Sequence, residues 1–238
     1  MRTYGDRGPR VVLLHGGPGA AGEMAPVARE LADAFQVIEP LQRASGEEPL
    51  TVDIHVEDLR EVVGAYGADA IVGFSWGAML ALAFAAEHPT LVKRLVLIGC
   101  GTFDLASRAK LQRNIKERGD RARAPIAFDA RGHEETWSNM IHLQQRGVYP
   151  QAFQAIRCPV QMIHGADDPH PGRMIFENLR AFMPQLAYQE IARCGHYPWI
   201  ECEAPEEFYR ALILAVRQRV RLDRPIFPHF PPVVMRTS

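Results

Sequence analysis

Short apolar runs alternate along the chain with segments whose apolar residues recur at helical spacing. A run that is apolar at successive positions is typical of a parallel strand covered on both faces. Apolar residues three and four positions apart are typical of a helix that packs against such a sheet. The predicted strands cover 11–14, 36–38, 70–74, 94–98, 159–164 and 186–191. The predicted helices cover 24–34, 53–63, 76–87, 174–182 and 204–219, with Thr51 or Asp53 as the cap of the second.

This alternation predicts an α/β fold with a mostly parallel sheet covered by helices on both faces. Residues 1–100 and 157–221 form its core, whereas residues 101–156 lack strand-like runs and are expected to form a small helical lid. Loops at the carboxyl ends of the strands are then expected to hold the active site. The tail, residues 222–238, contains four prolines, which exclude regular helix and central strand.

The composition is that of a globular protein, with 238 residues, 47% hydrophobic residues and 23% charged residues. A net charge of -1 gives no general attraction to nucleic acid or to an anionic membrane, and neither partner is expected. The chain has no apolar stretch long enough to span a membrane and no signal-peptide pattern at its start. The four cysteines lack C-x-x-C spacing, so we expect reduced thiols in a cytoplasmic protein.

The strongest chemical signal is Gly73-Phe74-Ser75-Trp76-Gly77, which lies between a predicted strand and a predicted helix. Gly-x-Ser-x-Gly in this context is the pattern of a nucleophile elbow, a tight turn that presents a serine above the sheet. Small residues must flank the serine where backbone segments nearly touch. Ser75 is therefore the candidate nucleophile.

A serine hydroxyl is a weak nucleophile that needs a base, and the base needs an acid to orient it. His196 follows the strand at 186–191, and Asp168 follows the strand at 159–164. We expect His196 to be the general base and Asp168 to fix its tautomer, with Asp167 as the alternative acid. The order Ser, Asp, His is the order found in α/β hydrolases.

The glycine loop His15-Gly16-Gly17-Pro18-Gly19 follows the first predicted strand. Acyl transfer needs two N–H donors aimed at the oxyanion, and we expect them from Gly17 and from Trp76. A phosphate-binding loop is the alternative, but the G-x-G-x-x-G pattern and the P-loop lysine are both absent.

Substrate would contact Gly16 of this loop and Phe103, Trp137 and Met140 of the insertion, although packing within the core or the lid would equally account for the three apolar residues. A metal site at Asp167, Asp168 and His170 finds no matching ligands elsewhere, so no metal and no cofactor are expected.

Together these motifs resemble the α/β-hydrolase superfamily over about residues 10–100 and 157–220, and the glycine loop with Ser-Trp-Gly is similar to the proline iminopeptidase branch. The resemblance implies a serine hydrolase that cleaves a small-molecule carboxylic ester or amide through a Ser75 acyl-enzyme. An aminopeptidase of the iminopeptidase type, another chemistry on the same residues and a non-catalytic ligand-binding member are the alternatives.

The chain departs from that branch in two places. The branch carries Asp-x-Arg-Gly-x-Gly after the second strand, where this chain has Leu41-Gln42-Arg43-Ala44-Ser45-Gly46. An aminopeptidase also needs carboxylates for the substrate ammonium, and the short insertion offers only the adjacent pair Glu134 and Glu135.

The family places an antiparallel hairpin before the first parallel strand, but only nine residues precede that strand here. We therefore expect the sheet to lack this hairpin and to expose the edge at 36–38. An open edge invites coverage. The tail around 226–234, or a second subunit in a homo-oligomer, would provide it, whereas a frayed tail is the alternative.

Overall fold

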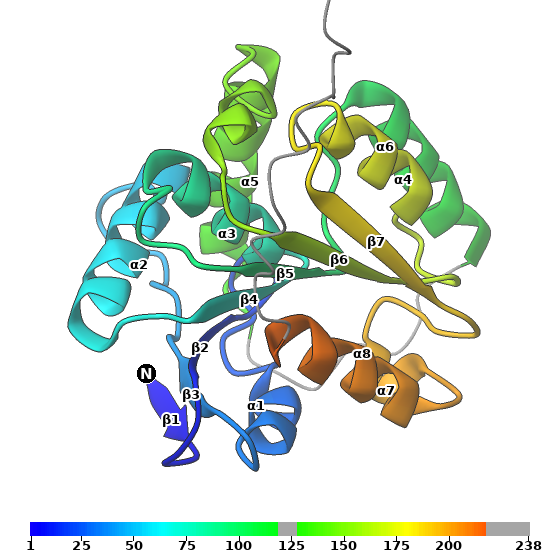
Figure 1. The fold of residues 1–238 in the computed structure, drawn as a ribbon. Coiled ribbons are helices and arrows are strands. Elements are labelled where there is room, and N and C mark those ends of the chain that lie inside the picture. Colours follow the sequence, from blue (N-terminus) through cyan, green and yellow to red (C-terminus); the bar gives the residue numbers. More distant parts are fainter. Residues whose placement is uncertain (119–127, 218–238) are drawn as a thin grey trace, which may run out of the picture.

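The computed structural model describes residues 1–118 and 128–217, and it confirms the predicted sheet covered by helices on both faces (Figure 1). The tail 222–238 and the end of the helix predicted at 204–219 lie outside the described residues. One sheet has the strand order β1-β3-β2-β4-β5-β6-β7, in which every neighbouring pair except β1 and β3 is parallel. The strands are β1 (Arg2–Tyr4), β2 (Arg10–Leu14), β3 (Gln36–Glu39), β4 (Ala70–Phe74), β5 (Leu95–Ile98), β6 (Val160–Gly165) and β7 (Leu186–Ile191).

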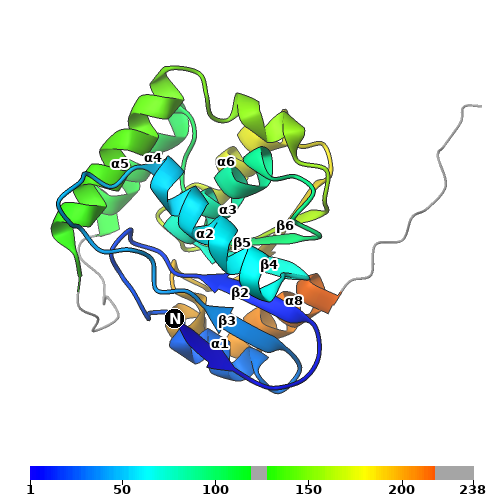
Figure 2. The same cartoon turned by 90° about the vertical axis from the view of Figure 1, so that its left-hand side faces the viewer.

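The helices lie in two layers on opposite faces of the sheet, as the two views show (Figures 1 and 2). One face is covered by α1 (Ala25–Leu31), α7 (Pro198–Glu201) and α8 (Pro205–Arg217). The other is covered by α2 (Val52–Tyr66), α3 (Trp76–Glu87) and α6 (Gly172–Arg180). The insertion contributes α4 (Leu105–Arg118), α5 (Ala130–Gln145) and the short 3-10 helix η1 (Gln151–Ala155).

Successive residues of β2 belong to two separate hydrophobic clusters, one on each face of the sheet. Val12 and Leu14 belong to the cluster under α2 and α3, whereas Val11 and Leu13 belong to the cluster over α1 and α8. Side chains alternate between the faces of a strand, so a continuous apolar run is required when both faces are covered. This double burial is the physical reason why the central strands β2, β4 and β5 were predictable.

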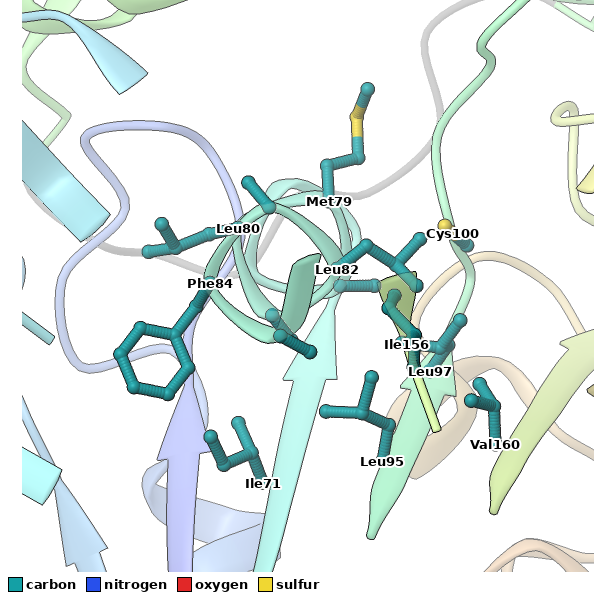
Figure 3. Packing of buried hydrophobic residues seen from close by; sticks show 14 of the residues in the cluster. Ile71, Met79, Leu80, Leu82, Phe84, Leu95, Leu97, Cys100, Ile156 and Val160 are labelled. Atoms are coloured by element: carbon teal, nitrogen blue, oxygen red, sulfur yellow. The ribbon is translucent and has the colours of Figure 1, made fainter. Parts of the chain in front are cut away.

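The central helix α3 is buried along nearly its whole length. Figure 3 shows side chains of α3, among them Leu82, above side chains of the sheet, among them Leu95 and Leu97 of β5. A helix that is apolar all round has no solvent face to set its rotation. Close packing against β4 and β5 therefore fixes α3, and with it the residue that precedes it, Ser75.

The expected open edge at 36–38 is wrong. β1 pairs antiparallel with β3 and lies beside it at the edge of the sheet (Figure 1). Arg2 stands opposite Glu39, and Tyr4 stands opposite Val37. The nine residues before β2 hold this single strand, and the described chain has no two-stranded hairpin there. Tyr4 Oη also donates to Glu39 at 2.9 Å. A short, polar strand thus covers the edge, and the pairing needs neither the tail nor a second subunit.

In the described part of the chain, no helix combines the length and the apolar character that crossing a bilayer would require.

Thr51, and not Asp53, caps α2. Its extended backbone precedes the helix, and its hydroxyl accepts from the backbone N–H of Ile54 at 3.3 Å. Thr51→Ala should lower the free energy of unfolding by about 1 kcal/mol because that N–H loses its partner. Thr51→Ser keeps the acceptor and should remain close to wild type. Urea unfolding checks both, and equal stability of the Ala and Ser variants would contradict this role.

Candidate active site

Ser75 sits in a strained turn between β4 and α3. Its φ of 52° and ψ of -114° are unusual for a residue with a side chain. A Cβ on Gly73 would lie 2.2 Å from the carbonyl oxygen of Gly77, and a Cβ on Gly77 would lie 2.5 Å from that of Leu14. Both flanking positions therefore require glycine, and the turn holds the serine above the carboxyl end of β4.

The structure brings the hydroxyl of Ser75 together with His196 and Asp168. Nε2 of His196 lies 3.2 Å from Oγ of Ser75, and Nδ1 lies 2.7 Å from Oδ2 of Asp168. Asp168 is buried, whereas Asp167 is exposed and its backbone N–H donates to Cys194 O. Of the two carboxylates considered, Asp168 is therefore the one in contact with the imidazole.

Opposite charges dominate the electrostatics of this pair. Burial by itself raises the pKa of Asp168, but the facing imidazoles of His196 and His170 outweigh it and hold the pKa well below its ordinary value. Burial by itself lowers the pKa of His196, but Asp168 outweighs it and the net pKa is raised above 6.5. Asp168 is thus a carboxylate near neutral pH, and it favours a proton on the adjacent imidazole.

The glycine loop has one N–H already occupied. The backbone N–H of Gly16 donates to Glu23 Oε1 at 2.5 Å, and burial raises the pKa of Glu23 to about 7. Gly17, with φ of 107°, has a backbone conformation that favours glycine. Of the two central glycines, Gly17 is thus the one whose N–H is not held by this carboxyl. Trp76 opens α3, where the first N–H groups have no partner within the helix.

Gln42 joins the glycine loop to the elbow. Its side-chain oxygen accepts from Trp76 Nε1 at 2.7 Å, and its side-chain nitrogen donates to His15 O at 2.8 Å. Its backbone N–H donates to Nε2 of the His15 ring at 3.0 Å, so the ring proton lies on Nδ1, which faces Gly16 O. Burial lowers the pKa of His15 to about 4 and keeps it neutral. One amide thus fixes both segments that carry the candidate oxyanion donors.

A disulfide and a hydrogen bond hold the loop that carries His196. Cys194 and Cys202 form a disulfide that encloses His196, which corrects the expectation of four reduced thiols. Cys100 and Cys158 are free and buried. The backbone N–H of Tyr197 also donates to a carboxylate oxygen of Glu201 at 2.7 Å.

The helices of the insertion contact the loops around Ser75. Asp129, at the start of α5, accepts from the backbone N–H of Ser45, and its own N–H donates to Gly19 O. His133 Nδ1 lies 3.1 Å from Pro18 O. On the other side Asn114 of α4 donates to Pro169 O at 2.7 Å. The insertion therefore borders both the glycine loop and the loop that carries Asp168.

The predicted substrate-contact residues occupy different environments. Phe103 and Met140 are buried in the hydrophobic cluster, and the Phe103 ring contacts that of Phe153. Trp137 is partly buried, and its ring lies edge-on to Trp76 with centroids 6.2 Å apart. The Gly16 N–H is taken by Glu23. Trp137 is therefore the member of this set that combines partial exposure with contact to the elbow.

Asp168, His170 and His196 place donor atoms within 4.8 Å of one another, a spacing that a metal ion can use. Asp167, the third member of the site considered from sequence, is not in this group. The rings of His170 and His196 are stacked, with an interplanar angle of 22°. Lone pairs lie in the ring planes, so nearly parallel rings do not direct them to a common point. The cluster is better described as a hydrogen-bonded group around a carboxylate.

Sequence reasoning missed Glu23, Gln42 and the role of His170 beside Asp168. Glu23 precedes the helix predicted at 24–34 and Gln42 follows the strand predicted at 36–38, and neither residue belongs to a motif that marks a partner for it. Only the pairing of distant segments reveals their partners, which in Gln42 are 27 and 34 residues away.

Comparisons with known proteins identify the family of the chain. A model of the Alpha/beta hydrolase family matches residues 11–211. A proline iminopeptidase from Neisseria meningitidis is 34% identical over 167 residues, which cover 62% of this chain and 53% of that protein. The chain thus spans about half the length of the curated iminopeptidases that it matches. A pimeloyl-[acyl-carrier protein] methyl ester esterase from Chromobacterium violaceum is 26% identical, over 89% of this chain and 95% of the esterase.

Solved structures share the fold. An esterase from Thermogutta terrifontis superposes with a TM-score of 0.67 at 21% identity, covering 89% of this chain and 90% of that one. A hydrolase from Pseudomonas aeruginosa gives 0.69 at 18% identity, covering 92% and 93%. These matches confirm the predicted fold class.

Replacing glycine by alanine should change the stability of the protein in opposite directions at Gly73, where the backbone is crowded, and at Gly64, where space is open. Gly73→Ala should lower the free energy of unfolding by about 3 kcal/mol because its Cβ meets backbone that cannot move away. Gly64→Ala, in α2 with open space around it, should raise it by about 0.5–1 kcal/mol. Chemical denaturation of both variants measures this, and a Gly73→Ala protein as stable as wild type would show that the turn is not tight.

Proposed function

The chain belongs to the alpha/beta hydrolase family, and from this premise we propose that it cleaves a small-molecule carboxylic ester or amide through an acyl-enzyme on Ser75. The observation that carries the proposal is the unbroken series of contacts from Ser75 Oγ through the His196 ring to Asp168. Such a series supplies a nucleophile, a base and the group that orients the base.

In the proposed reaction Nε2 of His196 takes the proton of Ser75 as the hydroxyl attacks the acyl carbon. The imidazolium then gives this proton to the leaving alcohol or amine, and the acyl group remains on Ser75. His196 next removes a proton from water as the water oxygen attacks the acyl carbon. The bond to Ser75 Oγ then breaks, the imidazolium returns the proton to Oγ, and the carboxylic acid leaves. Asp168 stays ionised throughout and stabilises the charged imidazole.

The backbone N–H groups of Gly17 and Trp76 would hold the oxyanion of each tetrahedral intermediate. Loss of one such donor typically costs about 3 kcal/mol of transition-state stabilisation. Gln42, which contacts both the glycine loop and the Trp76 side chain, keeps the two donors in a fixed relation.

Ester hydrolysis is favoured over aminopeptidase activity by the lid. Glu135 accepts from the Leu50 N–H and from Arg131, and Glu134 is exposed. The acidic pair considered for a substrate ammonium is therefore not presented together at the site. The esterase relative also matches over nearly all of both chains. Iminopeptidase activity remains the second candidate because those relatives are 34% identical.

A fluorophosphonate probe tests the nucleophile. It should label the wild-type protein, because activated serine attacks phosphorus, and it should leave Ser75→Ala unlabelled. Mass spectrometry of the labelled peptide locates the adduct. Absence of labelling in folded wild-type protein would favour a ligand-binding member of the family without catalysis.

A substrate panel then separates the two candidate activities. p-Nitrophenyl esters of short acids should be hydrolysed faster than proline p-nitroanilide. The opposite ranking would replace the esterase proposal by the iminopeptidase one.

The state of His196 predicts the pH dependence. Nε2 must be unprotonated to accept the serine proton, so kcat/KM should fall as the pH drops below the pKa of His196. Because Asp168 raises that pKa, the midpoint of this acid limb should lie above 6.5. Initial rates with an ester across the pH range measure it, and a flat profile between about pH 5 and 8 would contradict the role of His196.

A further inference from the structure

Three imidazoles surround the carboxylate of Asp168, although the proposed reaction uses only His196. On the other carboxylate oxygen, Oδ1, the ring Nδ1 of His170 lies at 2.9 Å and the backbone N–H of His170 at 2.8 Å. Nε2 of His164 lies 3.2 Å from Oδ2, the oxygen that faces His196. Both oxygens are thus in contact with imidazole nitrogen.

His170 is itself held firmly in this position. Its ring stacks on that of His196 with centroids 4.5 Å apart, and its carbonyl lies 3.1 Å from Nε2 of His164. An ionised carboxylate oxygen can only accept, so the proton of the His170 ring that faces it lies on Nδ1. By the same rule the His164 proton lies on Nε2, which faces two acceptors. Burial lowers the pKa of His164 to about 4 and keeps that ring neutral.

We propose that His170 is a positioning residue for the His196 base: its Nδ1–H fixes Oδ1 of Asp168 and so leaves Oδ2 aimed at His196. This inference rests on the proposed hydrolase function, because it assigns His170 to the same site. His170 does not touch Ser75 in this scheme and transfers no proton.

The physical reason is that a carboxylate held through one oxygen can turn about its Cβ–Cγ bond. Two N–H donors on Oδ1 define the plane of the group and thereby the direction of the second oxygen. These donors also share the negative charge that stabilises protonated His196. Removing the ring donor should therefore loosen Asp168 and, at the same time, strengthen its pull on the His196 proton.

Other charged groups facing His196 stay in place when position 170 changes. They are Glu23 from the segment before α1 and Glu201 from α7, both of which raise the pKa of His196. His164, from β6, faces Asp168 and is neutral. A change in the titration of His196 can then be assigned to the contact between positions 170 and 168.

Two substitutions separate the donor from the ring. His170→Asn places an amide N–H where Nδ1 stands but removes the stacked ring. His170→Phe keeps a ring against His196 but has no donor. The Phe variant should lower kcat about tenfold with little change in KM, as expected for a lost hydrogen bond to a charged group, and should move the acid limb of kcat/KM to higher pH. The Asn variant should retain a nearly wild-type kcat and pH profile.

His142→Asn, on the exposed surface of α5, is the matched control and should leave both quantities unchanged. Thermal melting of each variant identifies any loss of fold. If the Phe variant does not fold, His170→Ala serves as the donor-free variant.

An NMR titration of the His196 ring gives a readout that does not require turnover. Its pKa should rise in the Phe variant and stay close to wild type in the Asn variant. Wild-type kcat and His196 titration in a folded donor-free variant would overturn the inference. Equal impairment of the Asn and Phe variants would overturn it as well, because the ring and not the donor would then matter. Failure of fluorophosphonate labelling would reject the hydrolase proposal separately, since the titration remains measurable.

Discussion

The hydrogen bond between the Asp168 carboxylate and Nδ1 of His196 is the contact on which the proposed chemistry depends. It joins two loops that are 28 residues apart in the chain and holds a buried negative charge. Such a charge is costly unless it is paired and hydrogen-bonded. The same bond places the imidazole proton on Nδ1, so that Nε2 faces Ser75 with a free lone pair. Tautomer, orientation and charge are therefore set by one contact.

The sheet brings these loops together because parallel neighbours end at the same edge. β6 and β7 pair in register up to Gly165 opposite Ile191, and Asp168 and His196 follow these ends within a few residues. Space beside the pair is kept by Gly99 after β5, where a Cβ would lie 3.1 Å from the His196 ring. Ser75, the third residue of this group, follows β4 and is held in place by the buried helix α3. Stability of the core and geometry of the site thus come from the same packed layers.

Much of this arrangement is predictable from sequence where a buried element requires an uninterrupted run of apolar residues. β4 and α3 have the predicted bounds, since β4 is buried throughout and α3 is buried along nearly its whole length. β7 also has the predicted bounds, although three of its six residues are exposed. β1 escaped prediction because its three residues are polar and largely exposed. Helix α7 has four residues, too few to show a period.

The candidate site divides in the same way. The elbow and the order of Ser75, Asp168 and His196 were visible because strand ends and glycines mark them. Contacts of Gln42 and His170 were not, because they depend on how loops from separate strands meet. The disulfide was also missed, since cysteine spacing alone does not determine pairing. Phe103 shows a further limit: an apolar residue in a lid segment gives no sign of whether it lines a pocket or fills the core.

The most direct test is the position of the proton on His196. Nitrogen-15 NMR of protein labelled at histidine, recorded above the pKa of His196, distinguishes the two neutral tautomers. We expect a protonated Nδ1 and an unprotonated Nε2, with this preference lost in Asp168→Ala. A proton on Nε2 in the wild-type protein would contradict this expectation, because that nitrogen could not then receive the proton of Ser75.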